Sequence, residues 1–222
     1  MSNFPLPLRI KSVIIKGRPF NNEIAVKKHY ILLSLLGTLW GIVETQLGSL
    51  LHAADLPFIG LLMMSFGIFF QTTGRLITRL RGSAILMAIV VIFIKMLIIG
   101  GIAFPIAVAI FLQSLLLESI YLHASPSRWR TCLAGAAAVS YSLFHPFLSL
   151  PLFMGLSFSD AYDRIVLGGS ALLGLPEQSA WLIFLLLLLL HLSIGAASAF
   201  VSYGFAVKLQ ERGLLPAGFS NR

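Results

Sequence analysis

The sequence has 222 residues, of which 58% are hydrophobic and only 11% are charged. A water-soluble domain usually has about a quarter of its residues charged, so this composition excludes an ordinary soluble protein, and the high hydrophobicity excludes a disordered chain. The formal net charge is +8. In a chain that crosses a membrane several times, such an excess orients the protein rather than binding nucleic acid. The single cysteine, Cys132, excludes an intramolecular disulfide and a cysteine-based zinc site.

Six apolar stretches are long enough to cross a membrane, because a transmembrane helix needs about 20 mostly apolar residues. They lie at residues 30–51, 57–75, 83–102, 104–122, 131–155 and 181–205. The third and fourth are separated only by Gly100-Gly101 and the nearby Pro105, which predict a tight hairpin. We therefore predict an all-α integral membrane protein. Its six-transmembrane-helix bundle, at 29–207, lies between a basic N-terminal tail at 1–28 and a C-terminal tail at 208–222.

The positions of lysine and arginine predict the orientation of the chain. Every Lys and Arg other than Lys95 and Arg164 lies in the N-terminal tail, beside the loops after the second and fourth spans, or in the C-terminal tail. With six spans, all of these segments fall on one side. Since cytoplasmic loops carry the excess of Lys and Arg, we predict that both termini are cytoplasmic. The outer side then holds Arg164 together with Asp55, Asp160, Asp163 and Glu177.

The segment 156–180 is the one long connection on the predicted outer side. It starts with Ser157-Phe158-Ser159-Asp160, a possible helix cap, and continues through an apolar run to Gly168-Gly169. We expect one or two short amphipathic helices that lie against the bundle and are joined at the glycine pair. Two interpretations stay open: an inert connector at the membrane surface, or a lid over an outward-facing site.

Strongly polar side chains inside the predicted spans are costly in hydrocarbon, so each one needs a partner or a function. Counted from the cytoplasmic end of its span, an ionisable group lies at a similar depth in each of four helices, slightly outside the membrane centre. With a glutamine and two neighbouring aromatic residues they form the predicted substrate site: Trp40, Glu44, Lys95, Gln113, Tyr141, His145 and His191. Converging polar groups with aromatic walls are typical of a small-molecule pocket. Glu118, near the cytoplasmic end of its span, is instead expected to be an interface residue.

The same residues allow other interpretations. In a purely structural one, Glu44 and Lys95 form a buried pair and each histidine donates to a neighbouring carbonyl. In another, His145 and His191 serve a haem- or quinone-associated redox protein. A glutamate and two histidines could also ligate a transition ion, but no HExxH or CxxC spacing occurs, and whether a metal is bound stays open. No nucleotide-binding loop or protease motif is found, so we expect neither enzymatic activity nor a resident cofactor.

The first span carries a stripe of small residues, within which Gly37-Thr38-Leu39-Trp40-Gly41 is a GxxxG motif. Small residues let another helix approach closely, which is how helices associate in lipid. The stripe is compatible with packing inside the bundle and with contact to another subunit. The sixth span repeats the pattern more weakly with Gly195, Ala199 and Ser202.

A compact six-span bundle with small residues along its first helix resembles the substrate-binding S component of energy-coupling factor (ECF) vitamin transporters. The most similar region runs from Leu35 to about Tyr121. It includes the GxxxG segment, Leu56-Pro57-Phe58 in the first outer loop and Arg81-Gly82-Ser83 at the start of the third span. The family's small positions are usually alanines, whereas this chain has glycine, serine and threonine.

The resemblance implies that Ser34, Gly37 and Gly41 contact a transmembrane coupling subunit. It also implies that His145, His191 and the 52–57 loop face the substrate. The expected function is a substrate-capture subunit in the bacterial inner membrane, which binds a vitamin-like molecule or metal complex from outside and delivers it with ATP-binding partner subunits. The chain has no ATPase of its own, so energised import would need these partners.

Overall fold

The computed structural model describes residues 20–54, 58–100, 104–122 and 127–212, with side chains described from Lys27 onward. Predictions that fall on Asp55, on the 55–57 loop or on the two tails beyond these ranges lie outside the described residues. Within them the chain forms seven α-helices, one short 3-10 helix and no strand. The helices are α1 (Phe20–Ala53), α2 (Ile59–Thr78), α3 (Ser83–Ile99), α4 (Phe104–Leu122), α5 (Arg128–Met154), α6 (Phe158–Leu173), η1 (Glu177–Ser179) and α7 (Ala180–Glu211).

Each of the six predicted spans corresponds to one helix, and the all-helical architecture is confirmed. Among the described residues, four helical segments are long and apolar enough to cross a membrane: 27–53 in α1, α4, α5 and 177–211, which contains α7. Helix α3 is apolar but has only 17 residues. Helix α2 carries Gln71, Thr72, Thr73 and Arg75 in its second half. The chain is therefore a helical membrane protein by length and composition, and the count of six spans stays a prediction.

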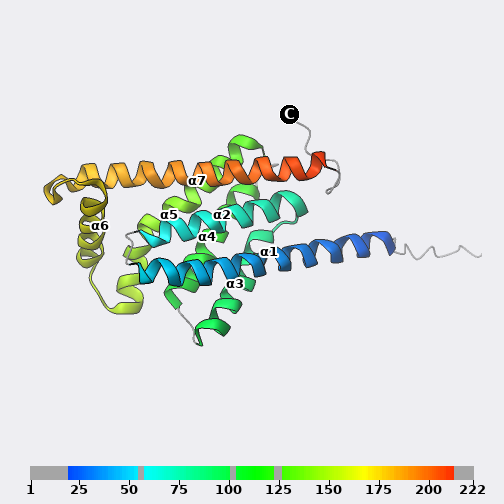
Figure 1. Ribbon diagram of the computed structural model, residues 1–222, viewed down its shortest axis with the longest axis horizontal. Helices are drawn as coiled ribbons and strands as arrows, with labels where there is room; N and C mark the ends of the chain where they lie inside the picture. Colours follow the sequence, from blue (N-terminus) through cyan, green and yellow to red (C-terminus); the bar gives the residue numbers. More distant parts are fainter. Residues whose placement is uncertain (1–19, 55–57, 101–103, 123–126, 213–222) are drawn as a thin grey trace, which may run out of the picture.

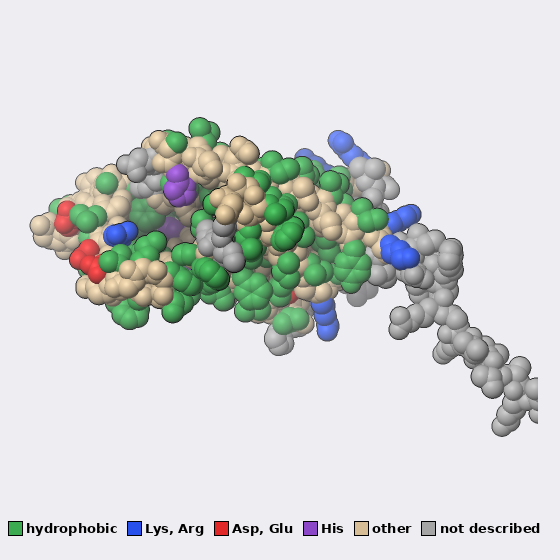
Figure 2. Space-filling model, turned by 90° about the horizontal axis from the view of Figure 1, so that it is seen from below, with side chains coloured by type: hydrophobic (Ala, Val, Ile, Leu, Met, Phe, Trp, Pro, Cys, Tyr) green, Lys and Arg blue, Asp and Glu red, His purple; other side chains and the backbone are tan. Residues whose placement is uncertain are grey.

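The bundle has two distinct ends. Figure 1 shows α1, α2 and α7 running along the long axis, with the start of α1 and the end of α7 at the same end. Helix α6 crosses the opposite end at a steep angle to α7 (Figure 1). In Figure 2, Lys and Arg side chains gather toward the end where the described chain starts and finishes, whereas acidic side chains lie at the α6 end. The structure thus has the charge asymmetry on which the predicted orientation depends.

Helices α5 and α7 pack closely against each other through glycine. A Cβ atom built on Gly135 would lie 2.5 Å from the backbone oxygen of Gly195 and 2.5 Å from Ala199 Cβ. Ser202, further along α7, hydrogen-bonds Thr73 of α2 at 2.8 Å. The small residues of the last predicted span therefore serve contacts inside the bundle, which is one of the uses of small residues in lipid.

The stripe on α1 also packs inside the bundle for the most part. Gly37 and Gly41 are buried. A Cβ on Gly37 would meet Val90 at 3.2 Å, and one on Gly41 would meet Ile94 at 3.0 Å, so both glycines lie against α3. Ser34 is exposed. The structure favours the packing interpretation for the two glycines, and of the three residues expected to contact a coupling subunit only Ser34 is open to one.

Glu118 is not the interface residue that its position suggested, because the residue is only 3% exposed. Its carboxylate accepts hydrogen bonds from the backbone N–H groups of Gly82, at 2.7 Å, and Ala84, at 3.3 Å. Nε of Arg75 lies 3.1 Å from its Oε1. The carboxylate therefore satisfies donors at the start of α3 and ties the α2–α3 turn to α4.

Helix α6 runs through Gly168-Gly169 without a break, so the expected glycine hinge is wrong. Ser157 and Asp160 make a capping box: Asp160 N–H donates to Ser157 Oγ at 3.2 Å, and Ser157 N–H donates to the Asp160 carboxylate at 2.7 Å. These side-chain and backbone hydrogen bonds from Ser157 lower the pKa of Asp160. Gly169 lies inside the helix, where a Cβ would collide with Ile183 of α7. The glycine allows close packing rather than bending.

Candidate ligand-binding cavity

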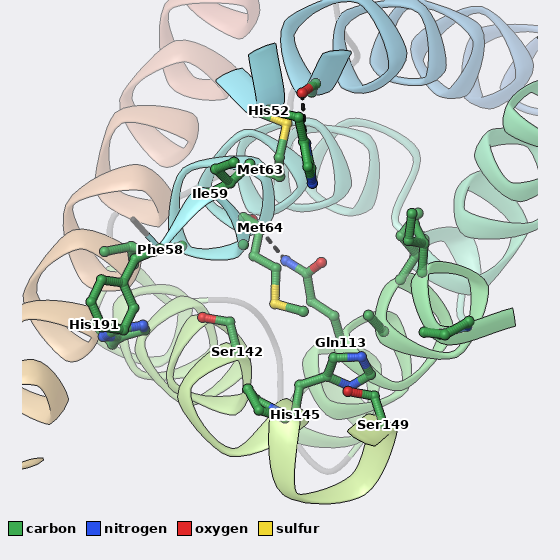
Figure 3. Close-up of a pocket in the computed structure, with 18 of the residues that line it drawn as sticks. His52, Phe58, Ile59, Met63, Met64, Gln113, Ser142, His145, Ser149 and His191 are labelled. Atoms are coloured by element: carbon green, nitrogen blue, oxygen red, sulfur yellow. Dashed lines mark hydrogen bonds between the residues drawn. The ribbon is translucent and has the colours of Figure 1, made fainter. Parts of the chain in front are cut away.

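A cavity of about 540 Å³ opens at the α6 end of the bundle, which is within the size range of small-molecule sites. It is lined by the end of α1, the starts of α2 and α4, and side chains of α3, α5, α6 and α7. Figure 3 shows three histidines around it, with His52 from α1, His145 from α5 and His191 from α7. The amide of Gln113 lies between them (Figure 3).

One wall of the cavity contains a buried ion pair. Nζ of Lys95 lies 3.1 Å from Oε1 of Glu44, and the two side chains are 12% and 6% exposed. Trp40 Nε1 donates to the other carboxylate oxygen of Glu44 at 3.3 Å. The indole packs tightly against Gly67 of α2, where a Cβ would lie 2.8 Å from Trp40 Cζ2. Removing one charge from so desolvated a pair would leave the other uncompensated.

The histidine on α5 has two hydrogen-bond partners. Its Nδ1 lies 2.8 Å from the hydroxyl of Tyr141, and the backbone of Pro105, at the start of α4, is a second hydrogen-bond partner of the His145 ring. The ring of Tyr141 also meets the imidazole edge-on, at 5.5 Å between centroids. His145 therefore lines the cavity as a fixed wall between α4 and α5.

The histidine on α7 is held by one nitrogen only. Nδ1 of His191 lies 2.6 Å from the backbone oxygen of Leu187, one turn earlier. Phe58, at the start of α2, meets the imidazole at 6.1 Å between ring centroids. Opposite, Gln113 donates through Nε2 to the backbone oxygen of Met64 at 2.7 Å. Both His191 and Gln113 are 1% exposed, so any ligand that reaches them must enter the cavity.

The structure brings together five of the seven residues predicted for the site: Glu44, Lys95, Gln113, His145 and His191 line the cavity. The two aromatic residues do not. Trp40 lies behind Glu44, and Tyr141 lies behind His145, so each supports a lining side chain instead of forming a wall. The apolar walls come from residues that the sequence analysis did not select, including Phe58, Met63 and Met64.

Other lining residues were missed although the sequence carries a signal for some of them. Ser142, His145 and Ser149 are spaced three and four residues apart, so they share one face of α5. His52 lies in the segment that the family resemblance pointed to. Arg164, Ile165 and Gly168 of α6 also line the cavity, so this helix forms part of its wall. Arg164 is the exposed cation of this lining.

Comparisons with protein families, with characterised proteins and with solved structures find no match to this chain. The site therefore stands on its own geometry. It offers a half-open cavity with apolar walls, one buried ion pair and a few fixed polar atoms, which is an arrangement for binding a small molecule. Among the described residues, no group of three or more His, Cys, Asp or Glu is placed to hold a metal ion.

Proposed function

We propose that this protein is the substrate-capture subunit of an ECF-type importer in a bacterial inner membrane. In this proposal the chain spans the membrane six times with both termini in the cytoplasm. It binds a vitamin-like molecule or metal complex from outside and passes it inward with a coupling subunit and ATP-binding subunits. The observation that carries the proposal is the cavity at the α6 end, opposite the basic end of the bundle.

The position of the cavity supports capture from the outer face. By the positive-inside rule the basic end is cytoplasmic, and the α6 end then faces outward. The cavity opens at that end and reaches inward to Glu44, Lys95 and Gln113. The buried polar atoms at its base are costly in a membrane unless they have a function, and a solute-binding site supplies one.

The test is to purify the full chain in detergent and identify the small molecules that co-purify with it by mass spectrometry. We expect one organic compound or metal complex to be enriched in wild-type preparations and depleted in Gln113→Leu and His191→Phe. Cys132→Ala, a change outside the cavity lining, is the matched control and should retain it. Preparations of the folded protein that contain no enriched molecule, and bind no added solute, would contradict the proposal.

A redox function is the alternative, because His145 and His191 line the same cavity. Both rings use Nδ1 for hydrogen bonds within the bundle, so an axial ligand would have to be Nε2, and His145 would have to give up its bond to the Pro105 backbone if that bond uses Nε2. An absorbance spectrum of the same preparation decides between the two functions. A Soret band that disappears in His191→Phe would favour the redox protein over the importer subunit.

A further inference from the structure

The hydrogen-bonding state of His191 identifies what the base of the cavity can recognise. Its Nδ1 lies 2.6 Å from the carbonyl oxygen of Leu187. Because a carbonyl oxygen only accepts, the hydrogen of the neutral ring is on Nδ1 and Nε2 presents a lone pair. Among the described residues, no partner is found for this Nε2, although the residue is 1% exposed. Figure 3 shows the ring at the edge of the cavity with Ser142 across from it.

A second acceptor lies on α4, where Nε2 of Gln113 donates to Met64 and the amide oxygen keeps its lone pairs. This oxygen lies toward Gly67 of α2, since a Cβ built on that glycine would be 3.2 Å from it. Ser142 repeats the pattern, because its hydroxyl donates to the backbone oxygen of Val139 at 2.8 Å and keeps only acceptor capacity toward the cavity. The proline at position 146 also has no N–H to donate to the Ser142 carbonyl.

The histidine at the entrance has the same orientation as the one at the base. Nδ1 of His52 lies 2.8 Å from the backbone oxygen of Gly48, so its Nε2 is likewise an acceptor in the neutral ring. The lining thus carries hydrogen-bond acceptors from α1, α4, α5 and α7. The ammonium of Lys95 already donates to Glu44. A ligand that displaces water from these acceptors loses binding free energy unless it brings donors of its own.

We propose that the ligand of this cavity is a planar nitrogen heterocycle whose ring N–H donates to Nε2 of His191. The apolar faces of such a ring would lie against Phe58 and Met64, which line the same part of the cavity. This inference rests on the proposed function and names the ligand class for it. A bare metal ion fits less well, because no described group of three ligating side chains is placed to hold one.

The test compares benzimidazole with 1-methylbenzimidazole, which differ by replacement of the ring N–H with N–CH₃. Binding to the full-length protein in detergent, with EDTA present, is measured by saturation-transfer NMR titration. We expect wild type to bind benzimidazole, and the methylated compound to bind about tenfold more weakly, which corresponds to one lost hydrogen bond. His191→Phe should abolish this preference, because phenylalanine fills the space and accepts nothing.

Two further variants keep the test falsifiable. His191→Gln retains an acceptor at this position, so it should keep the preference for benzimidazole to within about threefold. His29→Phe, a histidine on α1 outside the cavity lining, is the matched control and should change nothing. A zinc titration without EDTA supplies the competing outcome: tight zinc binding that His191→Gln removes would overturn the heterocycle in favour of a metal.

The remaining outcomes separate this inference from the proposed function. Equal binding of the two compounds, a preference that survives in His191→Phe, or no binding of benzimidazole would each overturn the N–H donor ligand. In those cases a different molecule that co-purifies with wild type would still support an importer subunit. If nothing co-purifies and no added solute binds, both proposals fail together.

Discussion

Lys95 on α3 reaches Glu44 on α1 with 3.1 Å between Nζ and Oε1, at a point where both side chains are nearly excluded from solvent. The pair joins two helices and at the same time lines the cavity. We expect Lys95→Leu to lower the free energy of unfolding by about 3–5 kcal/mol, because it leaves a buried carboxylate without a partner. Thermal unfolding in detergent, followed by the reaction of Cys132 with a thiol-reactive dye, measures the change.

The double variant Glu44→Leu/Lys95→Leu distinguishes a structural role of the ion pair from a role in ligand binding. Removing both charges should recover most of the lost stability. Recovered stability with weakened ligand binding would place the pair in the site, and this is the result we expect. Recovered stability with full affinity would mean that the pair only holds α1 to α3.

The glycine contact between α5 and α7 should be intolerant of even a methyl group. Gly195→Ala would press a Cβ into α5, so we expect a loss of about 1–3 kcal/mol of stability, the usual cost of overpacking. Gly204→Ala, on the same helix, is the matched control, since a Cβ there meets nothing within 4 Å. It should be neutral or stabilise by up to about 1 kcal/mol. Equal unfolding temperatures for the two variants would refute the close α5–α7 packing.

Substitutions at the small residues of α1 should affect stability at the buried glycines and leave it unchanged at the exposed serine. Gly37→Leu should destabilise the protein itself, because the added side chain meets Val90 and Met87 of α3. Ser34→Leu should leave stability unchanged, since Ser34 is exposed. If α1 contacts a coupling subunit through this face, Ser34→Leu should reduce co-purification of the partner while ligand binding is retained. A Gly37→Leu protein that is fully stable but fails to assemble would restore the coupling role of the glycine.

The orientation can be tested with single cysteines in a Cys132→Ala background. A cysteine replacing Asp163, on α6, should react in intact cells with a membrane-impermeant thiol reagent. One replacing Lys208, near the end of α7, should react only after the cells are permeabilised. Both positions are exposed, so burial does not confound the comparison. The reverse labelling pattern would place the cavity on the cytoplasmic face and reject capture from outside.

The cap of α6 gives a prediction about pH. Ser157→Ala should destabilise the first turn of α6 by about 1 kcal/mol, which hydrogen exchange of the α6 amides would detect. Because hydrogen bonds from Ser157 lower the pKa of Asp160, the stabilisation from its carboxylate is present above the unfolded pKa and is lost as pH falls through the lowered value. Asp160→Asn should remove this acid dependence, and an unchanged profile would mean that the cap does not hold α6.

Hydrophobic run lengths were enough to predict the helices, since the centre of each predicted span coincides with one helix. The convergence of Glu44, Lys95, Gln113, His145 and His191 also followed from the sequence, because depth in a membrane can be counted along a helix. Which way a side chain turns cannot be counted in this way. Trp40 and Tyr141 share the depth of the site but lie behind its lining residues Glu44 and His145, and this depends on how neighbouring helices are rotated.

Residues that act through contacts between distant segments were the least predictable. Glu118 resembled a surface residue because it lies near a loop in sequence. The partners that bury it, Arg75 and the backbone at Gly82 and Ala84, are more than 30 residues away. The glycine pair in α6 was mistaken for a hinge for the same reason, because the α7 side chains that require a glycine at position 169 are not visible in the local sequence.

The backbone contact between Gly135 and Gly195 has a consequence for how the cavity can exchange its contents. Because a Cβ on either glycine would collide with the other helix, the two backbones lie in close contact, and we expect α5 and α7 to move together as one rigid unit. His145 lies on α5, ten residues from Gly135, and His191 lies on α7, four residues from Gly195. Their separation should therefore be the same in the empty and the filled protein. Ligand exchange would then move other parts of the lining relative to α5 and α7. Among these parts, α6 and the end of α1 contribute the exposed side chains Arg164 and His52.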